Sequence, residues 1–142
     1  MMQVKVYLAG GMRTGWQDKV KEECKDLFDQ GLVEWKDPRD NKTSDPKLYG
    51  PLDRYACDDS RIFFGFAEKS NPLPFPLFME MGYCLGQENK VIIFVNEIED
   101  SDPRSRPMLF AKVFGCGHVL MEKELDEGIK LLKQFITILS NQ

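Results

Sequence analysis

Short β-branched and aromatic runs alternate with amphipathic segments along this chain, and that alternation limits the fold more than any other feature. Strands are predicted at residues 4–9, 32–35, 61–66, 91–95 and 118–120, and helices at residues 16–28, 51–58, 76–85, 108–113 and 123–139. Strands that alternate with helices form a parallel sheet through right-handed crossovers. We therefore predict one α/β, Rossmann- or flavodoxin-like domain over residues 1–142. Its sheet should have about five parallel strands and helices on both faces.

Composition narrows the class of protein. A chain of 142 residues with 42% hydrophobic and 30% charged residues is typical of one soluble globular domain. No apolar run approaches the roughly 20 residues that span a bilayer, and the first residues lack the pattern of a secretory signal, so we expect a cytoplasmic protein. The net charge of −4 comes with no basic stripe. A nucleic-acid polymer or a membrane is therefore an unexpected partner, and a small molecule is the expected one.

The chain also has few histidine and cysteine side chains that could act in catalysis or bind a metal. His118 is the single histidine, which leaves little material for histidine-dependent catalysis or a multi-histidine metal site. The four cysteines are far apart, form no Cys-x-x-Cys pair and are expected to be reduced and buried: Cys24, Cys57, Cys84 and Cys116. We predict no metal and no cofactor, so the carboxylates must carry any acid–base or nucleophilic chemistry.

Ligands of open parallel sheets bind beyond the carboxyl ends of the strands. The residues that the predicted order brings to this edge are Tyr7, Gly10, Gly11, Asp37, Arg39, Asn71 and Asn96. Asp53 belongs there as well, because it lies near the start of the helix that leads into the third strand. Trp16 could stack on a base, although packing in the core is the commoner role of such a side chain.

Glu80 is the most distinctive of the acidic residues. The apolar stripe of its predicted helix centres near Met81, and Glu80 lies on the shoulder of that stripe. A half-buried carboxylate near a helix start, at the ligand edge, combines a helix dipole that favours the anion with a partial desolvation that raises its reactivity. The alternative interpretation is an ordinary surface glutamate.

Several segments together resemble the nucleoside 2-deoxyribosyltransferase family, and the pattern covers most of the chain. They are Tyr7-Leu8-Ala9-Gly10-Gly11, Asp53, Asn71-Pro72, Met79-Glu80-Met81-Gly82-Tyr83 and Val91-Ile92-Ile93-Phe94. The resemblance implies a retaining exchange of bases in which Glu80 attacks the anomeric carbon of the sugar and holds the sugar covalently. It also implies that Asp53 assists the departing base and that Tyr7 orients the nucleophile. Asn71 could bind the sugar hydroxyls or merely begin a turn.

One position departs from the family, because Pro74 stands about six residues before Glu80, where well-known members carry an acidic residue. The family also completes its pocket with residues of a neighbouring subunit. The resemblance therefore implies a homo-oligomer built from dimers, and Asn96, Arg106 and Met108 are candidates for the borrowed residues.

Two other functions stay open. A hydrolase of the same superfamily would cut nucleosides or nucleoside 5-monophosphates with water as the acceptor, and Met12-Arg13-Thr14 could contact a phosphate. A non-catalytic nucleotide-sensing module could use the same sheet. The preference for purine or pyrimidine, and for ribose or deoxyribose, is open as well.

Overall fold

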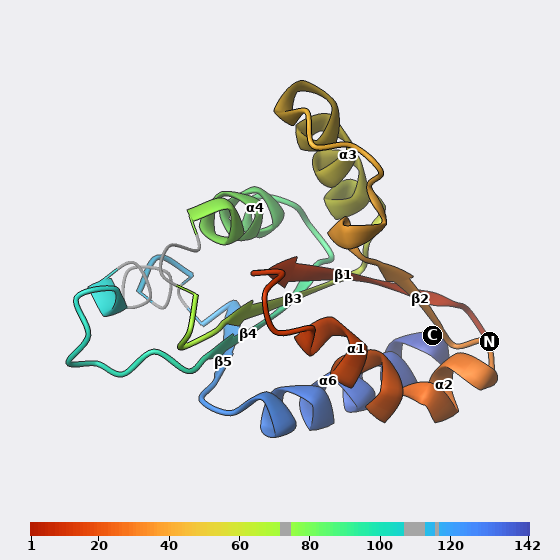
Figure 1. Ribbon diagram of the computed structural model, residues 1–142. Coiled ribbons are helices and arrows are strands. Elements are labelled where there is room, and N and C mark those ends of the chain that lie inside the picture. Colours follow the sequence, from red (N-terminus) through yellow and green to blue (C-terminus); the bar gives the residue numbers. More distant parts are fainter. Residues whose placement is uncertain (72–74, 107–112, 116) are drawn as a thin grey trace.

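The structure is a computed structural model that describes residues 1–71, 75–106, 113–115 and 117–142 (Figure 1). Its strands are β1 (Val4–Gly10), β2 (Val33–Lys36), β3 (Ile62–Ala67), β4 (Val91–Asn96) and β5 (Val119–Glu122). All neighbouring strands pair in parallel, in the order β2-β1-β3-β4-β5. This order is that of flavodoxin-like sheets, whose ligands bind where the strand order reverses, between β1 and β3. The predicted fold class is confirmed.

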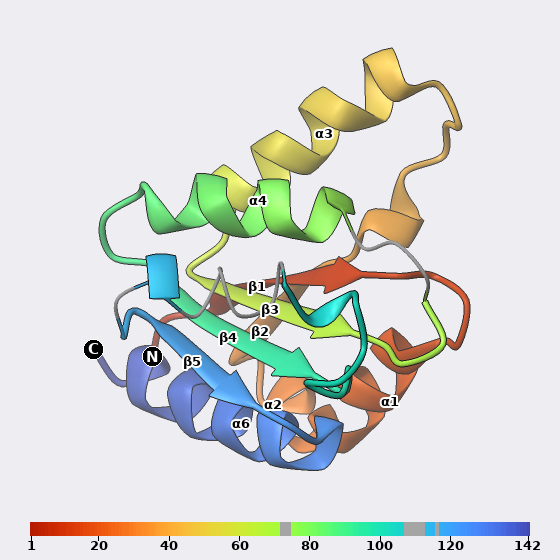
Figure 2. The same cartoon turned by 90° about the vertical axis from the view of Figure 1, so that its left-hand side faces the viewer.

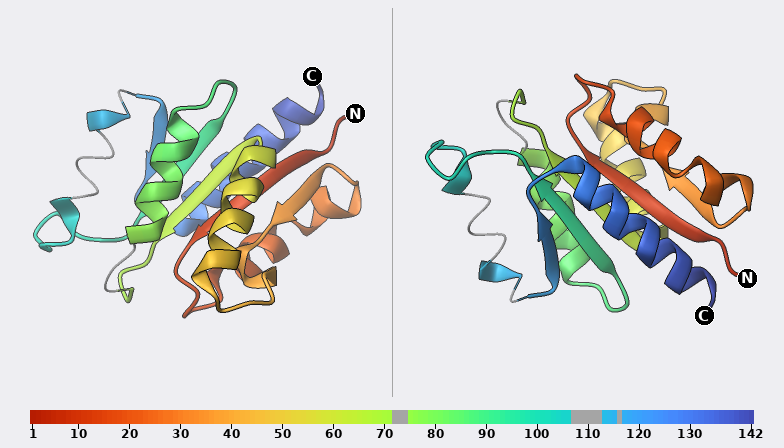
Figure 3. Two further views of the ribbon diagram at one scale, coloured as in Figure 1. Left: turned by 90° about the horizontal axis from the view of Figure 1, so that it is seen from above. Right: turned by 90° about the horizontal axis from the view of Figure 1, so that it is seen from below.

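Helices cover both faces of the sheet. The helices are α1 (Trp16–Glu23), α2 (Lys25–Asp29), α3 (Pro46–Asp59), α4 (Phe75–Leu85) and α6 (Leu125–Ser140), with a 3-10 turn η1 (Pro38–Asp40). Figure 3 shows α3 and α4 on one face and α1, α2 and α6 on the other. The two ends of the chain lie side by side at the amino edge of the sheet (Figure 2), where the Met2 amide donates to the Ser140 carbonyl over 2.9 Å. The loops that follow the strands begin at the opposite, carboxyl edge of the sheet.

Alternating side chains along the strands supply two separate cores. Val6 and Leu8 point to the α1, α2 and α6 side, whereas Tyr7 and Ala9 point to the α3 and α4 side. Helix α6 packs very closely on β4, because a Cβ atom at Gly128 would lie 2.3 Å from a methyl carbon of Val95. The thiols of Cys24, Cys57 and Cys84 are free and buried, as predicted, and Cys116 lies outside the described residues.

Two predicted helix boundaries were wrong. The helix expected to begin at Pro51 begins at Pro46, because the Asp45 carboxylate accepts a hydrogen bond from the Lys47 amide at 3.0 Å and Pro46 suits the first turn. Pro51 therefore lies inside α3, in an exposed stretch where water can hydrate the carbonyl group that lacks an amide donor. The helix expected over residues 16–28 is divided at Cys24 into α1 and α2.

The predicted helix at residues 108–113 falls almost entirely outside the described residues. Within the described part of the chain, no helix combines the length and the apolar character needed to cross a membrane.

Candidate active site

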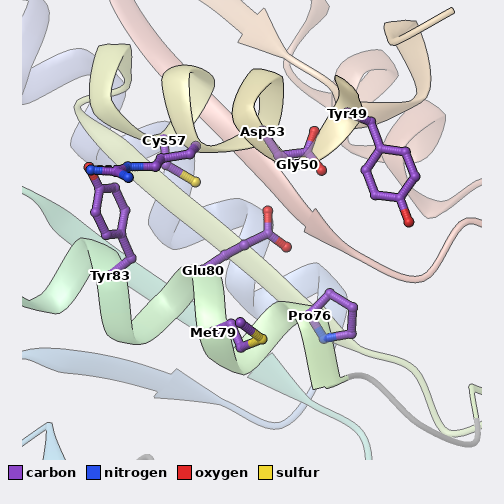
Figure 4. A pocket seen from close by; sticks show the side chains of 9 residues that line it. Tyr49, Gly50, Asp53, Cys57, Pro76, Met79, Glu80 and Tyr83 are labelled. Atoms are coloured by element: carbon purple, nitrogen blue, oxygen red, sulfur yellow. Dashed lines mark hydrogen bonds between the residues drawn. The ribbon is translucent and has the colours of Figure 1, made fainter. Parts of the chain in front are cut away.

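Glu80 occupies the shoulder position that its helix periodicity predicts. Helix α4 buries Leu77, Met81 and Cys84 against the sheet, while Glu80 is half-buried beside them. Figure 4 shows its carboxylate pointing into the space between α4 and α3, on the side where Asp53 also points. The residue is therefore neither a free surface charge nor part of the apolar core.

A tyrosine from the first strand holds this carboxylate. Tyr7 is fully buried in β1, where its ring packs beside Phe63, and its hydroxyl donates a hydrogen bond to Oε2 of Glu80. Burial and the adjacent Glu80 charge raise the pKa of Tyr7 far above its usual range, so the phenol keeps its proton and remains a donor. The bond fixes one carboxylate oxygen and leaves Oε1 of Glu80 for another partner.

Asp53 enters the same space from α3. Its carboxyl group is half-buried, and Oδ1 accepts a hydrogen bond of 2.6 Å from Nδ2 of Asn41, in the loop that follows η1. Burial raises the pKa of Asp53, and the hydrogen bond from Asn41 opposes that rise. Asp53 lies at the predicted edge of the sheet, whereas no sequence pattern predicts the contact with Asn41.

The surroundings of Glu80, including the Asp53 carboxyl group, disfavour its ionisation. The pKa of Glu80 is raised from its ordinary value of 4.5 to about 7. Burial is the main cause, the hydrogen bond from Tyr7 opposes the rise, and the nearby Asp53 charge adds to it. Desolvation and a like charge both disfavour the anion, and the phenol donor offsets part of this cost. Near neutral pH Glu80 can therefore hold a proton.

Two hollows meet at these carboxyl groups and share Tyr49, Asp53, Pro76 and Glu80. The first, of about 270 Å³, lies between α3 and α4, and its other lining residues are Gly50, Arg54, Cys57, Met79 and Tyr83 (Figure 4). The second, of about 420 Å³, opens towards the ends of β1 and β2, and its other lining residues are Tyr7, Gly10, Met12, Pro38, Arg39, Asn41 and Thr43. A ligand that spans both hollows would pass directly over Glu80.

The predicted residues at the end of β2 are brought to the site as an ion-paired group. Asp37 is buried and accepts from Lys21 at 2.7 Å and from Arg39 at 2.7 Å. Arg39 lines the larger hollow, and its guanidinium also contacts Asp18 at 2.7 Å. The positive charge of Arg39 is thus already balanced by two carboxylates, and it contributes little free positive potential to the pocket.

Trp16 is not brought to these hollows. Its side chain is 3% exposed, packs against Phe64 and Phe66 on the other face of the sheet, and donates from Nε1 to the Gly11 carbonyl over 2.8 Å. Its burial agrees with the commoner role of core packing, and the hollow that it does line is a separate one on its own face of the sheet. Its role in the structure is to hold the turn that follows β1.

Asn96 and Asn71 also lie apart from the two hollows. Asn96 is buried at the end of β4, where its side-chain oxygen accepts from the Ile98 amide at 2.9 Å and shapes the turn. The side chain of Asn71 packs against the glycine turn, since a Cβ atom at Gly11 would lie 2.2 Å from Nδ2 of Asn71. Of the remaining positions singled out in the sequence, Arg106 is exposed, and Pro74 and Met108 lie outside the described residues.

Three lining or buried residues were not predicted from the sequence. Tyr49 borders both hollows and lies in α3, in a stretch that was predicted to be a loop because the Asp45 cap was not recognised. Asn41 lies in the loop before α3, and no sequence pattern predicts its contact with Asp53. Glu68, at the end of β3, is 2% exposed, and neither of its carboxylate oxygens has a hydrogen-bond partner in the described part of the chain. It borders a third hollow, of about 290 Å³, on the α1 side of the sheet.

The described residues contain no group of three or more His, Cys, Asp or Glu side chains that could hold a metal ion. The arrangement around Glu80 instead offers a nucleophile or base, a second carboxyl group that can donate a proton, and a phenol that orients the first. These groups suit the cleavage of a bond between a sugar and a leaving group.

No protein-family model and no curated protein matches the sequence. Among solved structures, the chain is similar to a conserved protein from Enterococcus faecalis, with a TM-score of 0.67 and 13% sequence identity. The likeness covers 94% of this chain and 99% of that one. At this identity it shows the fold alone. Fold and geometry thus define an α/β domain with a paired-carboxyl pocket at the carboxyl edge of its sheet.

Proposed function

We propose that the protein is a nucleoside 2-deoxyribosyltransferase, which exchanges the base of a 2-deoxynucleoside through a covalent glycosyl-enzyme intermediate. The observation that carries this proposal is the hydrogen bond from Tyr7 to Glu80, with Asp53 on the opposite wall of the same pocket. These residues are the ones that the sequence resemblance assigns to the nucleophile, its orienting phenol and the acid for the leaving base.

In the first step, Oε1 of Glu80 attacks the anomeric carbon as the bond from that carbon to the base nitrogen breaks. The base departs with the bonding electrons and takes a proton from Asp53, because a nucleobase anion leaves poorly without one. In the second step, a nitrogen of the incoming base attacks the same carbon, the bond to Glu80 breaks and a proton returns to Asp53. Two inversions give net retention at the sugar.

A covalent role for Glu80 is favoured over a general-base role by the way its carboxylate is held. Tyr7 occupies Oε2, and the helix fixes the side chain beside two hollows that meet at the carboxylate. Fixing one oxygen directs the other towards a bound sugar, which lowers the entropic cost of attack.

Hydrolysis of nucleosides or nucleoside 5-monophosphates is the alternative. A phosphate in the larger hollow would meet Arg39, whose charge is already paired with Asp18 and Asp37, so this hollow suits an uncharged nucleoside better. Incubation with deoxyinosine, with and without adenine, separates the reactions by chromatography. Deoxyadenosine should accumulate when adenine is present. Free sugar formed equally fast without adenine would indicate hydrolysis, and no release of base in either mixture would favour a sensing module.

The nucleophile can be tested directly. With a 2-fluoro-2-deoxy nucleoside, which slows turnover of the intermediate, intact-protein mass spectrometry should show one sugar adduct on the peptide that contains Glu80. Glu80→Gln should lose both the adduct and base exchange. Glu88→Gln, which changes an exposed glutamate just beyond α4, should retain both. An adduct on another residue, or exchange that survives in Glu80→Gln, would overturn the mechanism.

We also propose that the protein is a homo-oligomer built from dimers. Helix α3 projects from the body of the domain (Figure 1), and apolar side chains on its outer part and on α4 are exposed: Leu48, Leu52, Tyr55, Phe75 and Met79. A second copy that packs on them would remove apolar surface from water and cover the hollow between α3 and α4. Light scattering of the active protein should give at least twice the chain mass, and an active monomer would refute the idea.

A further inference from the structure

The contact between Asn41 and Asp53 carries an inference that rests on the proposed function. Asn41 donates to Oδ1 of Asp53 over 2.6 Å, a short distance for an amide and a carboxyl oxygen. Among the described residues, no hydrogen bond to Oδ2 of Asp53 is formed. The two oxygens of this carboxyl group are therefore not equivalent.

This asymmetry decides where a proton can reside. An amide N–H group needs a lone pair on the oxygen that accepts it, so Oδ1 serves as the carbonyl-like oxygen when Asp53 is protonated. The proton then belongs on Oδ2, the oxygen without a protein donor. We propose that Asn41 is a positioning residue, which holds the Asp53 carboxyl group and keeps its transferable proton on Oδ2 for the departing base.

The groups around Asp53 are consistent with this role. Glu80 on α4 and Tyr7 on β1 share the pocket with Asp53, and Arg39, beside η1, lines the same hollow but is paired with Asp18 and Asp37. Asn41 is thus the neutral group that contacts Asp53 directly. Its bond favours the charged form, whereas burial favours the protonated form. Removal of the amide must therefore raise the pKa of Asp53 and also release the carboxyl group to rotate.

Asn41→Ala tests both consequences, with Ser44→Ala as the control, because Ser44 is an exposed, uncharged residue of the same loop. Carbon-13 NMR of the Asp53 carboxyl carbon measures its titration without any need for activity. The midpoint should rise by roughly one pH unit in Asn41→Ala and stay unchanged in Ser44→Ala. If Asn41→Ala does not fold, Asn41→Ser, which keeps a shorter donor, takes its place with a smaller expected rise.

Kinetics with a leaving-group series supply the second readout. For nucleosides with a poor leaving base, kcat/KM of Asn41→Ala should fall roughly tenfold, and for those with a good leaving base it should change little. A midpoint that stays or falls, or an equal loss across the series, would overturn the role of Asn41. If the midpoint rises but wild-type protein releases no base from any nucleoside, the placement of the proton stands and the proposed function falls.

Discussion

Replacement of Tyr7 by phenylalanine removes the single hydroxyl that donates to Oε2 of Glu80 and leaves the buried ring in place. The hydroxyl stabilises the carboxylate more than the carboxylic acid, so its loss must raise the pKa of Glu80. The proposed nucleophile is the carboxylate. Tyr7→Phe should therefore be impaired chiefly at low and neutral pH, and an alkaline medium should restore part of its activity.

The size of the effect follows from the ionisation of Glu80. A hydrogen bond to a charged group contributes about 1.5–3 kcal/mol, and about 1.4 kcal/mol corresponds to one pH unit. From a starting pKa of about 7, the midpoint should move to roughly 8–9. At pH 7 the ionised fraction of Glu80 would fall from about one half to between roughly a tenth and a hundredth, and kcat/KM should fall roughly 5- to 50-fold.

The assay is kcat/KM against pH between 5 and 9.5, with a nucleoside whose base leaves readily, so that the ionisation of Asp53 affects the rate little. Tyr83→Phe is the matched control, since the Tyr83 hydroxyl lies in the same pocket but donates to Asp58 at 2.6 Å. That variant should leave the midpoint of the acid limb where it is. A profile of Tyr7→Phe that is lowered equally at every pH would refute the proposed effect on Glu80 ionisation.

Three further outcomes are expected. Glu80 has a folded pKa of about 7 against an ordinary value of 4.5, so its contribution to stability is complete below about pH 4.5 and is lost as the pH rises through 7. Wild type should lose roughly 1–3 kcal/mol more unfolding free energy than Glu80→Gln between pH 5 and 8 in urea titrations, and parallel curves would contradict this. Asp53→Asn should slow exchange most for poorly leaving bases, which a leaving-group series would detect, and a uniform loss would indicate a structural role. Gly128→Ala should lose about 1–3 kcal/mol by the same titrations through its clash with Val95, whereas Gly82→Ala, with open space around it, should not.

Periodicity and the edge rule for parallel sheets were sufficient to predict much of the site. The stripe around Met81 placed Glu80 at the border of the core, and the strand order placed Tyr7 and Asp53 at one edge. These inferences depend on the backbone alone, because helix and strand repeats fix the direction of each side chain. The fold class followed from the same repeats.

Contacts between side chains of different loops could not be predicted in this way. The signal for the start of α3 was present at Asp45 and Pro46, but Pro51 offered a second plausible start, and the cap was overlooked. This error left Tyr49 in an apparent loop. Asn41 lies in a true loop, where no periodicity fixes the direction of a side chain. The face of the sheet on which Trp16 lies could not be predicted either, because spacing does not reveal which of two sheet faces a helix covers.

The position of β1 between β2 and β3 has a consequence for the order in which the protein can fold during its synthesis. Val6 of β1 pairs with Trp35 of β2 on one side and with Ile62 of β3 on the other. On the ribosome, β1 therefore remains without its second neighbour until β3 has left the exit tunnel, and the Tyr7 hydroxyl cannot donate to Glu80 until α4 follows. Such non-local pairing makes folding slow and leaves an apolar strand open to misassociation in the meantime. Chaperone contacts with the nascent chain should accordingly begin at β1 and end after α4.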